Sequence, residues 1–191
     1  SEMCIRDRSC SDEAVENGRV QLEEYPIVDY ILGLEKEDPV NRAYYKTFSS
    51  PMQRIITAYC QSEGNILVSG SYPGSDMNTS QGNREFTQKV LKYGYQSSLR
   101  NSLSGQINGL GRTISIPRLP NENRYAVTAP DCIVPVAPAF SVFTYSPDNQ
   151  SAGIAYKGNY RTFVMGFPFE SIESDKDRAM VMAAILNFFS D

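Results

Sequence analysis

The chain has 191 residues, of which 41% are hydrophobic and 21% charged, and a formal net charge of -4. This length suits one domain with a hydrophobic core, and without a cluster of lysine and arginine residues no nucleic-acid partner is predicted. The chain has no histidine, which excludes Ser-His-Asp and Cys-His-Glu relays and zinc sites with histidine ligands.

The N-terminal stretch SEMCIRDR, residues 1–8, has no apolar periodicity and resembles translated sequencing-adapter residue. We interpret it as a non-native leader and place a single domain, truncated at its N-terminus, at residues 9–191. The chain shows neither a secretory leader nor an apolar run long enough to cross a bilayer. Its four cysteines have no CxxC spacing, so neither a zinc knuckle nor a thioredoxin-like motif is predicted, and a disulfide among Cys10, Cys60 and Cys132 stays open.

The first half of the domain reads as helix, strand, helix, strand. Ser11 can cap a short helix that Gly18 ends, and the apolar run Tyr25–Leu34 predicts a strand buried on both faces. Ser50 as cap, Pro51 in the first turn and Gly64 as the stop predict a helix, and the strand Asn65–Tyr72 follows at once. Strand, helix and strand in this order favour a parallel sheet.

The second half begins with a predicted helix at Arg84–Tyr95 and an irregular segment that reaches about Asp131, with TISIP as a short strand. FSVFTY predicts a strand, and AGIAYKGNYRTFVMGF predicts a hairpin that turns at Gly158 and Asn159. Ser174 and the acidic residues after it begin a terminal helix whose apolar residues nearly encircle it.

Chemistry could be located first in the loop after the strand NILVSG, because ligands bind at the carboxyl ends of parallel strands. The candidate contact residues there are Ser69, Ser71, Tyr72 and Asp76, and Glu35 is a further ligand-contact candidate. The alternative, which we favour from local sequence, is a turn that simply needs small residues. SGSYPGSD lacks the Gly-Lys-Ser/Thr of a phosphate-binding loop, and no motif predicts a cofactor or a metal ion.

The second place is GFPFES, where Glu170 directly follows a strand. It could be a catalytic carboxylate, a helix-cap partner or a member of a salt bridge, and structural use is the commoner outcome.

The order of these elements resembles the class I glutamine amidotransferase-like fold, a flavodoxin-like α/β sandwich. The resemblance implies three layers around a mainly parallel sheet, with a C-terminal β-hairpin and a terminal helix. In active members a Gly-x-Cys-x-Gly elbow carries the nucleophile and a Phe-His-Pro-Glu-Ser segment supplies the base. Ser71 occupies the cysteine position here, Pro168 the histidine position and Glu170 the glutamate position. The resemblance therefore implies a vestigial site and no hydrolase chemistry.

Three longer blocks are also similar to a domain of secreted Bacteroidetes proteins labelled xanthan lyase or golvesin-domain proteins. The blocks lie in CSDEAVENGRVQLEEYPIVDYILGLEKE, YKTFSSPMQRIITAYCQSEGNILVSGSYPGSDM and AGIAYKGNYRTFVMGFPFESI. This similarity implies a secreted, periplasmic or cell-surface setting, further domains in the same polypeptide and a link to polysaccharide. It also implies that a first strand is missing from this chain.

Three functional hypotheses follow, in order of preference. The first is a non-catalytic accessory module that contacts polysaccharide or serves as a scaffold, and the next is a purely structural or assembly domain. The last is a lyase or glycosidase that works without histidine through tyrosine or paired carboxylates. Its candidate carboxylates are Glu35, Glu37, Asp76, Asp131 and Glu170.

Overall fold

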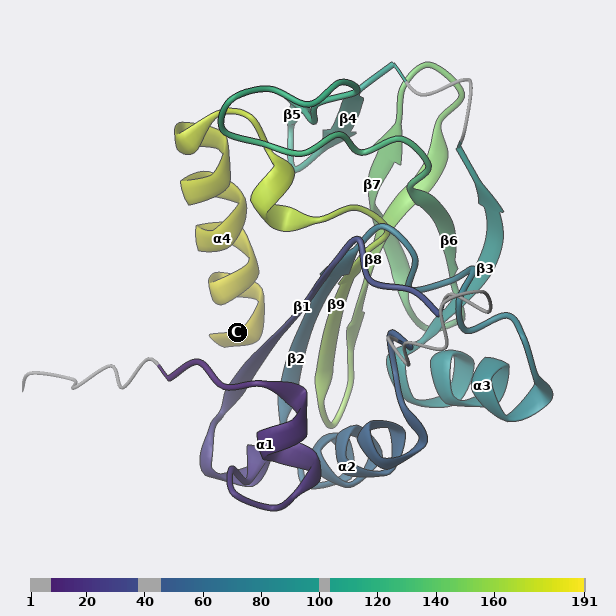
Figure 1. Ribbon diagram of the computed structural model, residues 1–191, viewed down its shortest axis with the longest axis vertical. Coiled ribbons are helices and arrows are strands. Elements are labelled where there is room, and N and C mark those ends of the chain that lie inside the picture. The colour runs from purple at the N-terminus through teal and green to yellow at the C-terminus, as the bar shows by residue number, and fades with distance from the viewer. Residues whose placement is uncertain (1–7, 38–45, 100–103, 191) are drawn as a thin grey trace, which may run out of the picture.

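The computed structural model of the chain describes residues 8–37, 46–99 and 104–190. Most of the proposed leader therefore lies outside the described residues. The described elements form a seven-stranded sheet with strand order β1-β2-β9-β8-β7-β4-β5 and a separate two-stranded sheet of β3 and β6 (Figure 1).

The N-terminal elements follow the local signals closely. They are α1 (Asp12–Glu16), the 3₁₀ turn η1 (Leu22–Glu24), β1 (Ile27–Gly33), α2 (Ser50–Gln61) and β2 (Asn65–Gly70). The cap of α2 is Ser49, one residue before the predicted one, and its hydroxyl accepts a hydrogen bond from the Met52 N–H at 3.1 Å. Pro51 lies in the first turn, where it removes no helical hydrogen bond.

The later elements depart further from the predictions. They are α3 (Gln81–Phe86), the π-helical turn η2 (Thr87–Leu91), β3 (Tyr93–Ser98), β4 (Gln106–Gly109), β5 (Arg112–Ser115), β6 (Asp131–Pro135), β7 (Phe140–Tyr145), β8 (Gln150–Lys157), β9 (Arg161–Met165), the 3₁₀ turn η3 (Phe169–Ser171) and α4 (Asp175–Ser190). The helix predicted to reach Tyr95 ends at Lys92, which has a left-handed φ of 67°. The segment predicted to be largely irregular contributes β4, β5 and part of β3.

The predicted flavodoxin-like sandwich is wrong, because the sheet is mixed. Only β1, β2 and β9 run parallel, whereas β9, β8, β7, β4 and β5 pair antiparallel. The hairpin predicted around Gly158 and Asn159 is present as β8 and β9. Since a hairpin and not a helical crossover follows β8, the sheet reverses direction there and continues as a curled, strand-rich layer with few helices.

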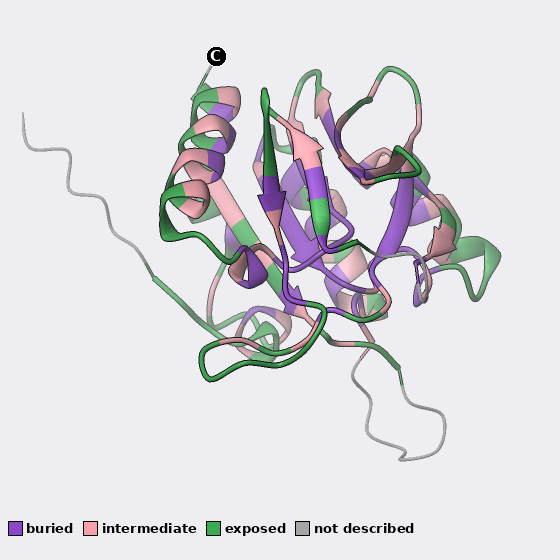
Figure 2. Ribbon diagram, turned by 90° about the horizontal axis from the view of Figure 1, so that it is seen from above, coloured by how far each residue is buried: buried purple, intermediate pink, exposed green. Residues whose placement is uncertain are grey.

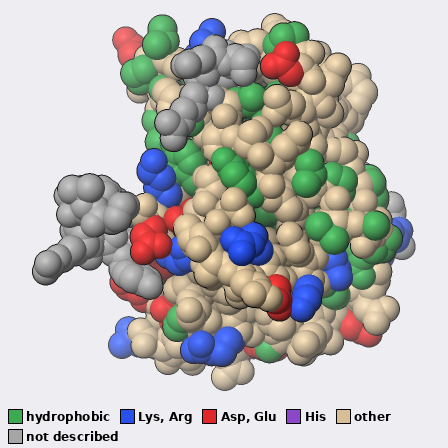
Figure 3. Space-filling model, turned by 90° about the vertical axis from the view of Figure 1, so that its right-hand side faces the viewer, with side chains coloured by type: hydrophobic (Ala, Val, Ile, Leu, Met, Phe, Trp, Pro, Cys, Tyr) green, Lys and Arg blue, Asp and Glu red, His purple; other side chains and the backbone are tan. Residues whose placement is uncertain are grey.

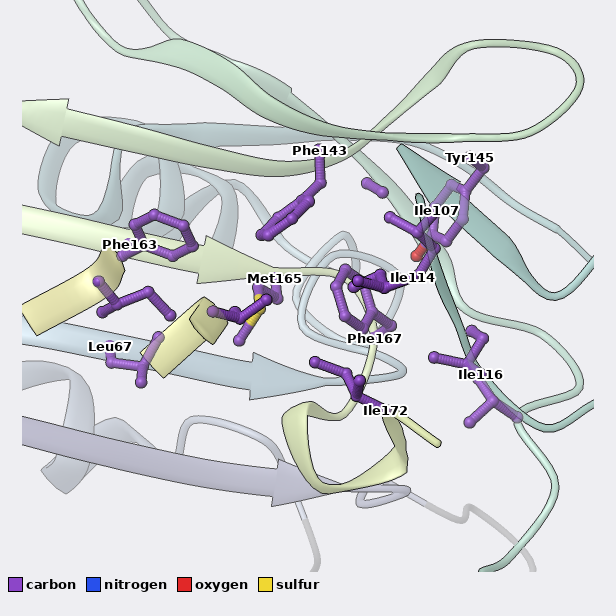
Figure 4. Close-up of a cluster of buried hydrophobic side chains, with 14 of the residues drawn as sticks. Leu67, Ile107, Ile114, Ile116, Phe143, Tyr145, Phe163, Met165, Phe167 and Ile172 are labelled. Atoms are coloured by element: carbon purple, nitrogen blue, oxygen red, sulfur yellow. The ribbon is translucent and has the colours of Figure 1, made fainter. Parts of the chain in front are cut away.

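Two hydrophobic clusters lie on opposite faces of the central strands. Leu67 belongs to the cluster that contains α4 and the β4–β5 hairpin, and its neighbour Val68 belongs to the cluster that contains α1 and α2. Figure 4 shows Leu67, Phe163, Met165 and Phe167 within the first cluster. The central strands are buried, whereas the outer surfaces of the helices are exposed (Figure 2). The alternation of strand residues between the two faces produces this division.

Strand β1 lies at one edge of the sheet, beside β2 alone. The prediction that both faces of this strand are buried is wrong, because the side chain of Ile31 is 64% exposed. Val28 and Tyr30 pack against the α2 cluster. The described helices therefore leave part of the other face of β1 in contact with solvent.

Candidate functional site

The carboxyl ends of β1, β2 and β9 meet at one end of the sheet, and backbone hydrogen bonds join them to the start of β6. The Ser71 N–H donates to the Gly33 carbonyl at 2.8 Å. The Asp131 N–H donates to the carbonyls of Ser71 at 2.9 Å and Gly166 at 3.1 Å. A Cβ atom at Gly166 would lie 2.1 Å from the Asp131 carbonyl oxygen. Only glycine permits this approach, which fixes the position of the loop that carries Glu170.

The two serines predicted at this edge are fully buried. The hydroxyl groups of Ser69 and Ser71 have no hydrogen-bond partner among the described residues. A serine becomes a nucleophile when a neighbouring base accepts its proton. The described residues place no such base on Ser71, so the geometry provides no activated hydroxyl.

Glu170 lies in η3, two residues after buried Pro168, and forms a well-defined polar contact at this edge. The Tyr125 hydroxyl donates to its Oε1 atom at 2.5 Å. The backbone of Gly33 lies next to these two side chains. A Cβ atom built on Gly33 would lie 3.4 Å from Oε1 of Glu170. Burial and then the contact with Glu170 raise the pKa of Tyr125. The phenol therefore stays protonated at neutral pH and holds the carboxylate in one orientation.

Two further acidic groups have raised pKa values near this edge. The pKa of Asp29 rises to about 6, first because neighbouring protein atoms desolvate the carboxyl group and then because Glu170 repels its charge. The pKa of Glu35 rises to about 7 through burial and then through the charges of Asp12 and Asp76. The edge therefore carries concentrated negative charge above neutral pH.

Asp76, a predicted contact residue, instead holds the backbone after β1. Its carboxylate accepts hydrogen bonds from the Glu37 N–H at 3.0 Å and from the Thr47 N–H and hydroxyl at 2.9 Å. The ammonium group of Lys46 lies 3.9 Å from the same carboxylate and 3.0 Å from that of Glu37. This use of Asp76 argues against its pairing with Glu35 as two catalytic carboxylates.

Asp131 is likewise occupied by structural contacts. Its carboxylate accepts from the N–H groups of Gly74 and Ser75 at 2.9 and 2.6 Å and from the Ser98 hydroxyl at 2.7 Å. These donors fix the loop after β2 against the two-stranded sheet. Burial is the largest effect on the carboxyl group and raises its pKa to about 6, although the hydrogen bonds oppose this rise.

The remaining predicted contact residue, Tyr72, is half-buried. The ammonium group of Lys36 lies 4.8 Å from the centre of its ring. This distance suits a cation–π interaction. The structure therefore brings Ser69, Ser71 and Tyr72 to the same end of the sheet as Glu170, and it turns Asp76 toward Thr47.

Acidic and basic side chains are interspersed on the face that carries α3 and β3 (Figure 3). In the described part of the chain, His, Cys, Asp and Glu residues form no group of three able to hold a metal ion. Within the same residues, no helix is both long and apolar enough to span a membrane.

Sequence reasoning missed Tyr125 and Asp29. Tyr125 lies in a segment predicted to be irregular, and no local pattern indicates that it reaches Glu170, 45 residues further along the chain. Asp29 did carry a signal, because it is the one charged residue within the strand sequence IVDYILG. A charge inside an apolar strand indicates an edge or a functional position.

The comparisons with known proteins support the fold and nothing finer. No protein-family model matches the chain, and no curated protein matches it. Among solved structures, the mmIFT52 N-terminal domain is similar, with a TM-score of 0.58 and 13% sequence identity. The match covers 95% of this chain and 83% of that one. At this identity the likeness shows the fold alone.

The two family resemblances drawn from the sequence are therefore corrected. A solved structure that matches is the mmIFT52 N-terminal domain, and the mixed sheet departs from the parallel sheet of a flavodoxin-like fold. None of these findings supports a glutamine amidotransferase or the secreted proteins labelled xanthan lyase. The interpretation of Ser71, Pro168 and Glu170 as a vestigial triad loses its basis with that family.

Proposed function

We propose that this chain is a non-catalytic binding module that contacts neutral polysaccharide through the Tyr125–Glu170 pair. The observation that carries the proposal is the hydrogen bond between these two side chains at the carboxyl edge of the sheet. Tyr125 is 36% exposed, so part of its ring is accessible while the hydroxyl is fixed.

The chemistry of the pair suits a sugar. An accessible aromatic ring offers an apolar face with a polar end, which matches the apolar faces and hydroxyl groups of a pyranose. Glu170 is half-buried, and its second oxygen can accept hydrogen bonds from vicinal hydroxyls. Charged acceptors form stronger hydrogen bonds than neutral ones, so one well-placed carboxylate contributes appreciably to orientation.

The charge of the edge selects the class of polysaccharide. Burial raises the pKa of Asp29 most, and the negative charge of Glu170 raises it further, so the two carboxylates repel each other. A uronic acid or sulfated sugar would add a third negative charge at short range, which disfavours binding. Neutral glucans, mannans and galactans carry no such penalty.

Two observations favour binding over turnover. The Ser71 hydroxyl has no described partner, and the carboxylates of Asp76 and Asp131 are occupied by backbone and hydroxyl donors. A glycosidase needs an acid and a base on opposite sides of the scissile bond, both free to reach it. Asp29 and Glu170 remain the pair that a catalytic alternative would have to use.

The test is affinity electrophoresis of the purified chain through gels that contain neutral or acidic polysaccharides. We expect retardation by at least one neutral polymer, and we expect Tyr125→Ala and Glu170→Gln each to weaken it about tenfold, the effect of losing one charged hydrogen bond. Glu173→Gln, an exposed carboxylate three residues further on, serves as the matched control and should leave retardation unchanged.

Retardation only by acidic polymers, or an equal effect of Glu173→Gln, would contradict the proposal. Release of reducing ends or unsaturated products from a retarding polymer would reject the non-catalytic part. The secreted setting, the further domains of a longer polypeptide and the purely structural alternative stay predictions, and absence of retardation by every polymer would favour that last alternative.

A further inference from the structure

Strand β1 presents a long backbone edge that no described strand covers. It spans seven residues and pairs in parallel with β2 on one side. The opposite edge of the sheet is β5, which has four residues. Figure 1 shows β1 at the outer side of the sheet, beside β2. Long edges with free N–H and C=O groups are sites where another extended segment can pair.

The register shows which residues face outward. The Pro26 carbonyl accepts a hydrogen bond from the Asn65 N–H at 3.3 Å. Backbone groups of a strand alternate between its two sides, so Val28 and Tyr30 direct theirs toward β2. Asp29 and Ile31 direct theirs away from β2, into the space beside the edge.

The side chains of these same two residues define what could pair there. Asp29 and Ile31 align with Leu67 and Ser69 of β2, so they share the face of the sheet that carries α4. Ile31 is 64% exposed, and Leu34 just beyond the strand is 42% exposed. Along this face, the negatively charged Asp29 is thus followed two residues later by the exposed apolar side chain of Ile31.

We infer that the edge of β1 binds an extended peptide segment that carries a lysine or arginine opposite Asp29 and an apolar residue opposite Ile31. Opposite charges on directly paired residues stabilise a sheet, whereas like charges destabilise it. Asp29 therefore discourages pairing with acidic or wholly apolar strands and leaves a basic strand as the matching partner. Glu170 lies close enough to Asp29 to repel it, which strengthens this preference. The inference does not depend on polysaccharide binding.

The probe is the synthetic peptide TVKVIVT, fluorescently labelled, with TVEVIVT and TVKPIVT as matched peptides. Fluorescence anisotropy should give binding of TVKVIVT that is about tenfold tighter than that of TVEVIVT, because a favourable cross-strand charge pair becomes a repulsive one. TVKPIVT should not bind, since proline removes an N–H donor and disrupts the extended pairing. Asp29→Lys should reverse the preference between the first two peptides.

Asp148→Lys places the same charge change at an exposed turn residue and should leave the preference unaltered. Circular dichroism of both variants establishes that each is folded. Equal binding of the lysine and glutamate peptides, or binding of the proline peptide, would overturn the inference. Self-association of the chain in sedimentation that Asp29→Lys abolishes would assign the edge to a second copy and would overturn it as well.

Discussion

Buried polar groups at the end of β2 fall into two kinds. Asp76 and Asp131 are surrounded by donors that fix the loops after β1 and β2. Ser69 and Ser71 are equally buried, yet no described group receives or gives a hydrogen bond at their hydroxyls. A buried hydroxyl without a partner lowers stability by about 1–3 kcal/mol relative to one that is satisfied. These serines therefore differ in energetic role from the aspartates beside them.

Ser71→Ala should leave the free energy of unfolding unchanged or raise it by up to about 1 kcal/mol, because it removes an unsatisfied group. Ser98→Ala is the matched control: it removes the donor to Asp131 and should lower stability by about 1–3 kcal/mol. Urea unfolding followed by tyrosine fluorescence measures both values. A clear loss of stability in Ser71→Ala would show that its hydroxyl has a partner in solution.

At the scale of elements, α4 holds one face of the sheet together. Val181, Ile185 and Phe189 are buried against Leu67 and Phe163, whereas Leu186, the next residue after Ile185, is 43% exposed. The helix is thus less evenly buried than its apolar sequence predicts. Its contribution to stability should depend on this one stripe.

Ile185→Ala should lower the free energy of unfolding by about 2–5 kcal/mol, through lost burial and the cavity that remains. Leu186→Ala should change it by less than about 1 kcal/mol, since the side chain already contacts solvent. Equilibrium denaturation of the two variants compares neighbouring positions of the same helix. Equal losses would mean that α4 is rotated relative to the stripe described here.

Signals confined to a few residues predicted their elements well, and contacts between distant segments did not follow from the sequence. Pro51 lies in the first turn of α2 as predicted, and the turn with Gly158 and Asn159 joins β8 to β9. The left-handed residue after α2 is Glu63, with a φ of 66°, and not the predicted Gly64. The left-handed Lys92 ended a helix without glycine or asparagine, the residues that usually mark such a position.

In the candidate site, too, the sequence indicated one residue from its local position and missed the other, which a distant segment supplies. Glu170 was accessible to sequence reasoning because it comes a few residues after the apolar strand β9, which ends at Met165, and this placement puts it at the carboxyl edge. Its partner Tyr125 depends on how a long connection folds back over the sheet, which no local pattern encodes. The prediction of a mainly parallel sheet was wrong for a related reason. A strand–helix–strand unit specifies the parallel pairing of its own two strands, and it does not determine how later strands pair.

Across the whole molecule, the raised carboxyl pKa values predict how stability depends on pH. The pKa of Asp29 and Asp131 is about 6 and that of Glu35 about 7. Between their ordinary pKa values and these raised ones, the folded chain binds more protons than the unfolded chain. The free energy of unfolding therefore falls as pH rises through this window. The pKa of Glu85 is lowered by its hydrogen bond with Lys89, which acts in the opposite sense, but the pair lies at the surface, where solvent screens it.

We expect the chain to be more stable at pH 5 than at pH 8, with on the order of 1 kcal/mol of the difference from buried Asp131, because part of the effect of its raised pKa is already present at pH 5. Urea denaturation at constant ionic strength measures the profile. Asp131→Asn keeps a carbonyl for the N–H donors and removes the titration, so its profile should be flatter. Stability that rises steadily from pH 5 to pH 8 would contradict the assigned pKa shifts.

The division of the interior into two clusters gives each side of the sheet its own thiol. Cys60 lies in the cluster with α2 and Cys132 in the cluster with α4, and both side chains are buried. Burial raises the pKa of Cys60 to about 12, so its thiol reacts only when the structure opens. With Cys4 and Cys10 replaced by serine, the alkylation rates of Cys60 and Cys132 can be compared. Equal rates would show that the two clusters open to solvent in one event, and different rates would show that each opens separately.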